Sequence, residues 1–179
     1  MIEQPPTPIV RLVEVEPHEH HDWLARMEAA FAAGVSDAGL QPGDQPIPHA
    51  DEMAEMMQGP GEVLHLVVDD HVVGGAAVTD VTDGRRGLEL FFVDAGHHGG
   101  GVGGRAWDAI EARYPDTRVW ETDTPYFEQR NIHFYVNRCG FHIVEFFHPG
   151  HLPPEGSGAD HPGPDRSFRF EKVMSTTPA

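Results

Sequence analysis

The sequence predicts an α/β fold, an α+β arrangement on a mixed sheet, with the element order β-α-α-β-β-β-α-β-α-β-β. Segments with apolar residues at helical spacing alternate with short β-branched and aromatic runs, which are typical of strands. Two helical segments adjoin and three strands then follow one another, so the chain is not a regular βαβ series. A length of 179 residues suits one domain and is too short for two separate cores.

The first third of the chain predicts a tail, one strand and two helices. Residues 1–8 contain three prolines and are expected to form a disordered tail. Residues 9–15 alternate apolar and polar side chains, which favours a strand. Residues 18–33 follow helical periodicity, and Gly34 is expected to end that helix. Residues 49–58, with three methionines, predict a second, short helix.

The middle of the chain changes to strand periodicity. Residues 63–68 and 72–78 are β-branched runs joined at Asp69-Asp70-His71, which predicts a hairpin. Residues 87–93 form a third apolar run. A glycine-dense segment, residues 96–104, follows and opens into a helix. The apolar stripe expected on that helix comprises Val102, Ala106, Trp107, Ile110 and Tyr114.

The last part of the chain predicts strands around one more helix. Pro115 helps to end the preceding helix, and residues 118–122 form a short strand. Residues 131–139 form a helix that Gly140 closes, with Ile132, Tyr135, Val136 and Cys139 expected on one apolar face. Strands are expected over residues 141–147 and 168–174. One domain therefore spans residues 9–174, and residues 175–179 form a C-terminal tail.

Composition excludes several classes of protein. Twelve Lys and Arg against 29 Asp and Glu give a net charge of −17, which excludes a general nucleic-acid binder. No apolar run is long enough to cross a bilayer, and no secretory signal is visible. The single cysteine, Cys139, excludes an internal disulfide and a multi-cysteine zinc site. We therefore expect a soluble, cytoplasmic protein without membrane or nucleic-acid partners.

The glycine-dense segment predicts a phosphate site. Glycines let a phosphate approach the backbone, and the free N–H groups and positive dipole of the following helix attract anions. A dinucleotide interpretation fits by letters, because Gly101, Gly103 and Ala106 match the fingerprint and Glu121 follows at the ribose-binding distance. The context argues against a dinucleotide site. In that fold the strand runs directly into the first glycine, whereas seven residues separate Val93 from Gly101 here. Only 58 residues follow Glu121, which is too few to complete a doubly wound domain.

A coenzyme A pyrophosphate is the other interpretation, and here the chain resembles the GNAT N-acetyltransferase superfamily. That family has a strand ending in Val, then Gln/Arg-x-x-Gly-x-Gly/Ala opening a helix, and downstream Asn-x-x-Ala-x-x-Phe-Tyr-x-x-x-Gly-Phe in looser or tighter forms. The matching segments here are Val93-Asp-Ala-Gly-His-His98-Gly-Gly-Gly101-Val-Gly103-Gly104 and Asn131-Ile-His-Phe134-Tyr135-Val-Asn-Arg-Cys-Gly140-Phe141. The resemblance covers residues 9–147 and implies a single GNAT-like domain.

The resemblance implies acetyl transfer from acetyl-CoA, as co-substrate, to an amine acceptor. Backbone groups of Phe91, Phe92 and Val93 would hold the pantetheine arm. The pyrophosphate would lie on the loop formed by His98, Gly99, Gly100, Gly101, Val102, Gly103 and Gly104. Asn131 would contact the cofactor arm, and Tyr135 would contact it and protonate the leaving sulfur, since a phenol is neutral and can donate at pH 7.

The resemblance does not single out one general base or one acceptor. Glu89 and Glu121, both on strands beside the loop, are the two candidate bases. Residues 1–60 carry a net charge of −9, which favours a small cationic amine as acceptor. A homodimer is compatible with the sequence.

Two other functions remain as alternatives. One is a CoA-binding sensor or regulatory module that has lost turnover. The other is a metal-binding protein, because the chain has 13 histidines. None of these histidines forms a His-Glu-x-x-His pair, so no metal is expected.

Overall fold

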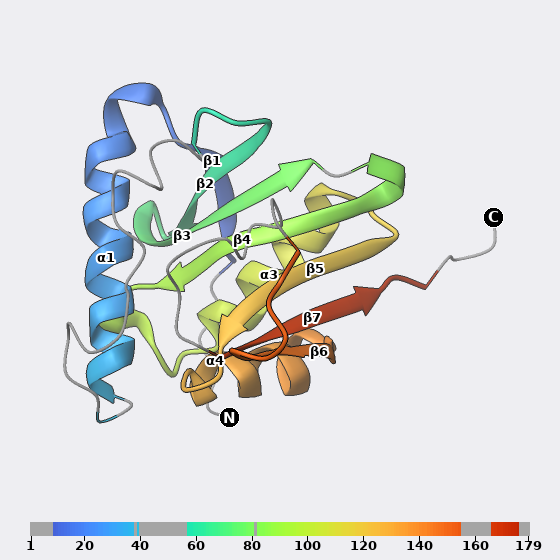
Figure 1. The fold of residues 1–179 in the computed structure, drawn as a ribbon. Helices are drawn as coiled ribbons and strands as arrows, with labels where there is room; N and C mark the ends of the chain where they lie inside the picture. Colours follow the sequence, from blue (N-terminus) through green and yellow to red (C-terminus); the bar gives the residue numbers. More distant parts are fainter. Residues whose placement is uncertain (1–8, 38, 40–56, 81, 155–165, 176–179) are drawn as a thin grey trace, which may run out of the picture.

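The computed structural model describes residues 9–37, 39, 57–80, 82–154 and 166–175. Within them, seven strands form one sheet in the order β1-β2-β3-β4-β5-β7-β6 (Figure 1). The strands are β1 (Arg11–Glu14), β2 (Gly61–Val68), β3 (His71–Asp80), β4 (Arg85–Val93), β5 (Val119–Pro125), β6 (His142–Phe147) and β7 (Ser167–Val173). All neighbours are antiparallel except β4 and β5, so the sheet is mixed, as predicted.

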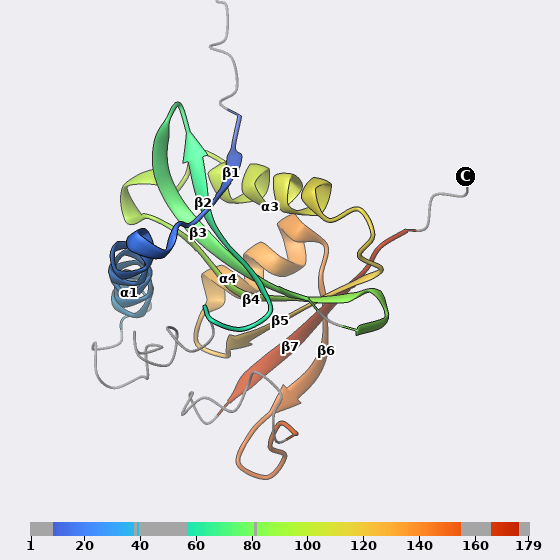
Figure 2. The ribbon, with the colours of Figure 1, turned by 90° about the horizontal axis from the view of Figure 1, so that it is seen from above.

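Helices cover both faces of this sheet. Figure 2 shows α1 on one side, and α3 and α4 on the other. The α-helices are α1 (His20–Asp37), α3 (Val102–Arg113) and α4 (Gln129–His133). A π-helical segment, η4 (Phe134–Cys139), continues α4, and short 3₁₀ turns are η1 (Pro17–Glu19), η2 (Thr82–Gly84) and η3 (Ala95–His97).

Apolar residues form a separate core on each face. Trp23 and Met27 of α1 pack with Leu90 and Phe92 of β4 in one core. The other core lies under α3 and η4 and contains Ala76, Val78, Leu88, Trp107, Ile110, Tyr114, Trp120, Tyr135, Cys139, Phe141 and Phe170. The two cores fix β4 from both sides, and β4 is the strand that leads into the glycine-dense loop.

The predicted hairpin and the apolar stripe of α3 are confirmed. β2 and β3 pair antiparallel, and the turn residues Asp69 and Asp70 have φ of 48° and 63°. Aspartate tolerates this left-handed region better than most side chains. The stripe residues of α3 are all buried, and the helix caps at Tyr114 just before Pro115.

Several boundaries, and the side chain of Val136, differ from the prediction. α1 runs through Gly34 to Asp37, and β5 extends beyond residue 122 to Pro125. The predicted helix over residues 131–139 begins at Gln129 instead and changes to a π-helix at Phe134. Val136 is 37% exposed, because the wider π turn rotates it away from the apolar face. Residues 49–56 of the second predicted helix lie outside the described residues.

Candidate active site

β4 and β5 separate part-way along the sheet and open a cleft beside β4. Their pairing covers only residues 85–87 and 119–121, after which the Thr122 hydroxyl donates to the Leu88 carbonyl oxygen at 2.8 Å. A register shift against β3 leaves Glu89 as a bulge, which bends the strand at this point. Beyond the bulge, β4 keeps its partners on β3, and its other edge faces the opening.

The glycine-dense loop follows directly on the end of β4. Gly99 and Gly101 have φ of 90° and 70°, a region that side chains with a Cβ rarely adopt. A Cβ added at Gly96, Gly99 or Gly100 would meet no atom within 4 Å, so this part of the loop presents bare backbone. Gly101 is the N-cap of α3, and Arg105 Nη2 donates to the Gly100 carbonyl oxygen at 2.8 Å. Arg105 of α3 therefore holds the loop in place, while the glycine backbone stays uncovered. The loop leads into the N-terminus of α3, a helix of 12 residues.

Gly103 and Gly104 have a different role, because they lie inside the first turn of α3. A Cβ on Gly103 would come within 3.2 Å of the Phe134 ring, and one on Gly104 within 3.3 Å of Arg138 Nη2. Both glycines let α3 approach η4 closely. The part of the loop with uncovered backbone thus centres on residues 98–101.

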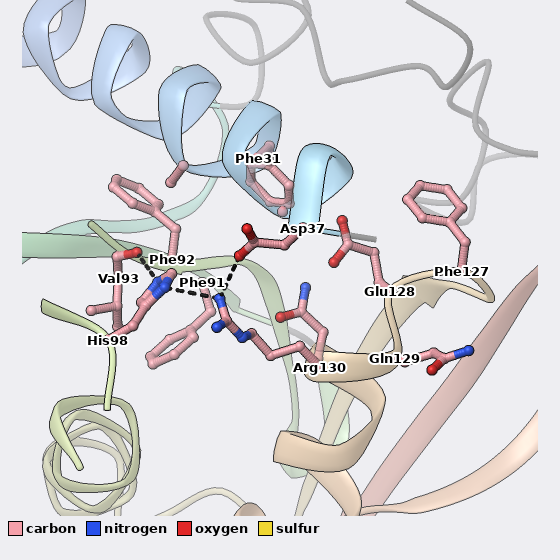
Figure 3. A pocket seen from close by; sticks show the side chains of 13 residues that line it. Phe31, Asp37, Phe91, Phe92, Val93, His98, Phe127, Glu128, Gln129 and Arg130 are labelled. Atoms are coloured by element: carbon pink, nitrogen blue, oxygen red, sulfur yellow. Dashed lines mark hydrogen bonds and ion pairs between the residues drawn. The ribbon is translucent and has the colours of Figure 1, made fainter. Parts of the chain in front are cut away.

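A cavity of about 570 Å³ lies between the end of α1, the end of β4 and the segment before α4 (Figure 3). It is lined by residues from three elements and two loops: Ala30, Phe31, Gly34, Asp37, Phe91, Phe92, Val93, His98, Phe127, Glu128, Gln129, Arg130 and Asn131. Five residues predicted to contact the cofactor, Phe91, Phe92, Val93, His98 and Asn131, therefore line one cavity. The loop glycines and Tyr135 do not line it.

A chain of polar contacts crosses this cavity. Arg130 Nη1 lies 3.1 Å from Asp37 Oδ2 and 2.9 Å from His98 Nδ1, and His98 Nε2 lies 2.7 Å from the Val93 carbonyl oxygen (Figure 3). The guanidinium must donate, so Nδ1 accepts, and Nε2 carries the proton that is donated to Val93. The neutral form of His98 is therefore the one that fits. Arg130 connects the end of α1 to the glycine loop.

Glu128 is the buried carboxylate of this cavity, and the sequence analysis did not single it out. Its side chain points toward the end of α1 in Figure 3, and the residue is only 7% exposed. Burial raises the pKa of its carboxyl group, against the opposing effect of Arg130. A Cβ on Gly34 would lie 3.4 Å and 3.5 Å from its two carboxylate oxygens. Gly34 therefore borders the Glu128 carboxylate, and a methyl group there would lie at ordinary van der Waals distance from its oxygens.

The spacing of the downstream motif could have located this residue. In Asn-x-x-Ala-x-x-Phe-Tyr, the Asn precedes the Tyr by seven positions. Counting back from Tyr135, that position is Glu128, which is the N-cap of α4, and Asn131 falls on the Ala position. Gly140 follows Tyr135 by five positions rather than four, and the π turn of η4 accommodates the additional residue.

Tyr135 lies at the point where β4 and β5 separate. It is 5% exposed, packs against Phe141 and Phe170, and lies near Thr122. Burial raises the pKa of its phenol, so the group is neutral at pH 7. The charge of Glu128 raises this pKa further, which shows that the two side chains are within electrostatic range of each other.

The two candidate bases predicted from the sequence lie elsewhere. Glu89 is exposed on the bulge, where the Thr79 hydroxyl lies 3.4 Å from its carboxylate, and it does not line the cavity. Glu121 forms an ion pair with Arg85, which also pairs with Glu171. It does not line the cavity either.

Two further groups bear on the alternatives. Cys139 is buried, and burial raises the pKa of its thiol to about 12, so it is a core residue. In the described part of the chain, no group of three His, Cys, Asp or Glu side chains is arranged to hold a metal ion. None of the described helices is long and apolar enough to span a membrane.

Comparison with known proteins gives a family and a fold. The model of the acetyltransferase (GNAT) family matches residues 21–141. A curated Bacillus subtilis (strain 168) protein, the uncharacterized protein YrkN, is 45% identical over 161 residues, which cover 86% of this chain and 87% of YrkN.

Solved structures show the same fold at lower identity. An acetyltransferase of Bacillus subtilis in complex with CoA has a TM-score of 0.63 at 17% identity, covering 94% of this chain and 99% of that one. The ribosomal-protein-S18-alanine N-acetyltransferase of Escherichia coli has a TM-score of 0.65 at 14% identity, covering 95% and 97%. An Elizabethkingia anophelis GNAT family acetyltransferase with acetyl-CoA bound has a TM-score of 0.63 at 10% identity, covering 95% and 100%.

Proposed function

Because the chain belongs to the acetyltransferase (GNAT) family, we propose that it transfers an acetyl group from acetyl-CoA to the nitrogen of a small cationic amine. The observation that carries this proposal is the separation of β4 from β5 next to an open glycine loop at the start of α3. Two of the solved structures with this fold contain CoA or acetyl-CoA.

The loop fits a pyrophosphate by its backbone. Gly99 and Gly100 offer bare backbone, and the N-terminus of α3 contributes free N–H groups and the positive end of its dipole. Arg105 and Arg130 place cations beside the loop, although His98 and Gly100 stand where the resembled family has cationic or amide side chains. Gly101, Val102, Gly103 and Gly104 would continue the contact along the first turn of α3.

The remaining cofactor contacts follow the open edge of β4. Phe91, Phe92 and Val93 would align the pantetheine arm through their backbone groups, and Asn131, which also lines the cavity, would contact it. Acetyl-CoA supplies an activated acyl group as a thioester. The residues of this chain would hold that group beside the acceptor amine, since proximity and orientation contribute much of the catalysis in such a transfer.

Tyr135 is proposed as the acid that protonates the departing sulfur. Its neutral phenol and its position beside Thr122, where the strands part, support this role. Glu89 and Glu121 are less suited to the role of general base, because Glu121 is paired with Arg85 and Glu89 lies exposed on the bulge of β4.

A cationic acceptor is supported by charge. The first 60 residues carry a net charge of −9, and two carboxylates, Asp37 and Glu128, line the cavity. We further propose that residues 9–174 form the catalytic domain, that the protein works in the cytoplasm, and that it can form homodimers.

Binding and turnover test the proposal separately. Acetyl-CoA is expected to raise the melting temperature more than NAD does, because it binds the native state preferentially. Addition of small primary amines should then release free CoA thiol. A larger shift with NAD would contradict the choice of cofactor. A shift with acetyl-CoA but no amine-dependent thiol release would favour the CoA-binding sensor.

A further inference from the structure

We infer that Glu128 binds the ammonium group of the acceptor and accepts its proton, and that the acceptor is a small monoamine with an apolar stem. This inference rests on the proposed acetyl transfer and adds to it a residue and a substrate class. The carboxylate that Glu128 presents in the cavity is the group that would recognise the amine.

The first support is that the Glu128 carboxylate is largely buried and is not paired with a hydrogen-bond donor or cation of the described residues. It is 7% exposed, and no described residue forms a hydrogen bond or close ion pair with its carboxylate; Arg130 acts on it only through longer-range charge. A buried carboxylate is costly unless it is paired. An ammonium group entering the cavity would supply both a charge and N–H donors.

The second support is the space around the carboxylate. A Cβ on Gly34 of α1 would lie in van der Waals contact with the Glu128 oxygens, so the glycine leaves the space of a methyl group beside the carboxylate. The pocket also takes in both the open edge of β4 and Glu128. An amine bound at Glu128 would therefore share this pocket with the proposed thioester site.

The third support is that the cavity has apolar walls and that its other described carboxylate, Asp37, already has a partner. Phe31 of α1 lies on the Glu128 side of the cavity (Figure 3), and Ala30 and Phe127 add apolar lining, whereas the rings of Phe91 and Phe92 pack on Phe134 and Trp23. Asp37 is paired with Arg130. Among the described lining residues, Glu128 is therefore the carboxylate that remains to bind a cation, and a single carboxylate can pair with a single ammonium group. One ammonium and an apolar stem match these walls better than a second charge would.

The groups that face Glu128 set its protonation. Arg130 lowers its pKa, burial raises it, and Tyr135 lies within electrostatic range on the η4 side. Among the described residues that line the cavity, Asp37 and His98 are the other titratable acid and base beside Arg130, and both contact Arg130. A carboxyl pKa that burial has raised makes a stronger base than an exposed glutamate.

Each proton in the proposed transfer step has a donor and an acceptor. The ammonium gives one proton to the Glu128 carboxylate and becomes a neutral amine. Its nitrogen forms the C–N bond to the acetyl carbon while the C–S bond breaks. Tyr135 donates its proton to the sulfur and regains one from the N–H that the nitrogen loses. Glu128 finally releases its proton to water.

The test compares two amines in wild-type protein and in Glu128→Gln. Phenethylamine is cationic at neutral pH, whereas trifluoroethylamine is largely neutral there. For phenethylamine, the variant should lose about 10²-fold or more in kcat/KM and also the acidic limb of its pH profile. For trifluoroethylamine, the loss should be far smaller, because no proton has to be removed. Putrescine, with two charges, should be a poorer substrate of the wild-type protein than phenethylamine.

Controls separate the possible failures. Glu14→Gln makes the same chemical change on exposed β1 and should leave both profiles intact. The acetyl-CoA melting shift should persist in Glu128→Gln. If the Gln variant does not fold, Glu128→Asp, which withdraws the carboxylate by one methylene, must show the same selective loss.

The outcomes are distinguishable. A wild-type protein that acetylates no amine overturns the proposed function and this inference with it. An active wild-type protein whose Glu128 variants keep full kcat/KM with phenethylamine overturns the inference alone. Equal losses with both amines would also overturn it, because Glu128 would then not act on the ammonium proton.

Discussion

Glu128 and Tyr135 influence each other where β4 and β5 separate. The negative charge of Glu128 raises the pKa of the Tyr135 phenol. Once Glu128 has accepted a proton, that effect disappears, and Tyr135 becomes a better proton donor. Uptake of the proton from the amine would therefore prepare the phenol to protonate the sulfur.

Tyr135→Phe tests the proposed acid. The substitution keeps the ring and its contacts with Phe141 and Phe170, so the fold and the acetyl-CoA melting shift should change little. Because the proton donor is removed, kcat should fall by about 10²–10⁴-fold. Steady-state kinetics would check this. A loss confined to KM would show that Tyr135 only positions substrate, and an unchanged kcat would withdraw its catalytic role.

Glu128→Gln should also change stability in a pH-dependent way. Burial raises the pKa of Glu128 in the folded state above its unfolded value, so the folded protein binds more protons within the interval between these two pKa values. Stability contributed by this group is therefore lost as pH rises through the folded pKa. Relative to wild type, the variant should gain free energy of unfolding at neutral pH.

Denaturant titrations over a pH series measure this difference. The gain of the Gln variant should shrink as the pH falls toward the unfolded pKa of glutamate, where Glu128 is protonated in both states. A variant that is less stable at neutral pH would show that the buried charge is well compensated, contrary to this account.

At the scale of elements, α1 shows how a glycine in a helix can serve a site. Gly34 is expected from sequence to end the helix, because glycine is common just beyond helix ends. Here the helix continues for three more residues to Asp37, and Gly34 faces the Glu128 carboxylate instead. The close approach between α1 and the residue before α4 is a tertiary contact, which local periodicity does not reveal.

Gly34→Ala should separate stability from function. Alanine stabilises a helix interior by about 0.5–1 kcal/mol over glycine, which corresponds to a rise of roughly 1–4 °C in melting temperature. The added methyl group would fill the space beside the Glu128 oxygens, so the KM for phenethylamine should rise several-fold. Calorimetry and kinetics check the two effects. An unchanged KM would mean that the amine does not approach Glu128 from the side of α1.

The glycine loop can be tested where a side chain meets no atoms. A Cβ at Gly100 has open space, whereas one at Gly103 would press on Phe134. Gly100→Asp adds a negative charge near the proposed pyrophosphate and should abolish the acetyl-CoA melting shift. Gly100→Ala adds only a methyl group and should keep most of it. Equal shifts in both variants would place the phosphate elsewhere.

The elements differ in how far sequence predicts them. Strong periodicity gave the strands of the central sheet and the buried face of α3, since every stripe residue there contacts the sheet or the core. The π turn of η4 follows from one extra residue between Tyr135 and Gly140 and has no periodic signal of its own. Glu128 also has no periodic signal. Asn131 matches the motif by residue type, whereas only the seven-position spacing back from Tyr135 indicates Glu128.

Side-chain pairing was equally hidden from the sequence. Glu121 looked available on a strand beside the loop, but Arg85 lies next to it across the parallel pair and neutralises it. His98 was expected to face a phosphate, yet it also contacts Arg130 and the Val93 carbonyl group. These contacts join residues 32 to 36 positions apart, apart from the local contact to Val93.

The net charge of the whole molecule, −17, creates a negative field that should attract a cationic acceptor. Raising the ionic strength from about 0.05 M to about 0.5 M shortens the screening length severalfold. We expect kcat/KM for phenethylamine to fall several-fold over this range, and that for trifluoroethylamine to change little. An equal response of both amines to salt would contradict electrostatic attraction of the acceptor.

The measurement that tests the central claim most directly is the stoichiometry of acetyl transfer. Purified protein is incubated with acetyl-CoA and phenethylamine, the acetylated amine is counted by mass spectrometry, and free CoA is counted by its thiol. The account predicts equal amounts of the two products, both dependent on the amine and both formed far more slowly by Tyr135→Phe and Glu128→Gln. Release of CoA without acetylated amine, or binding of acetyl-CoA with neither product across a panel of small amines, would contradict it.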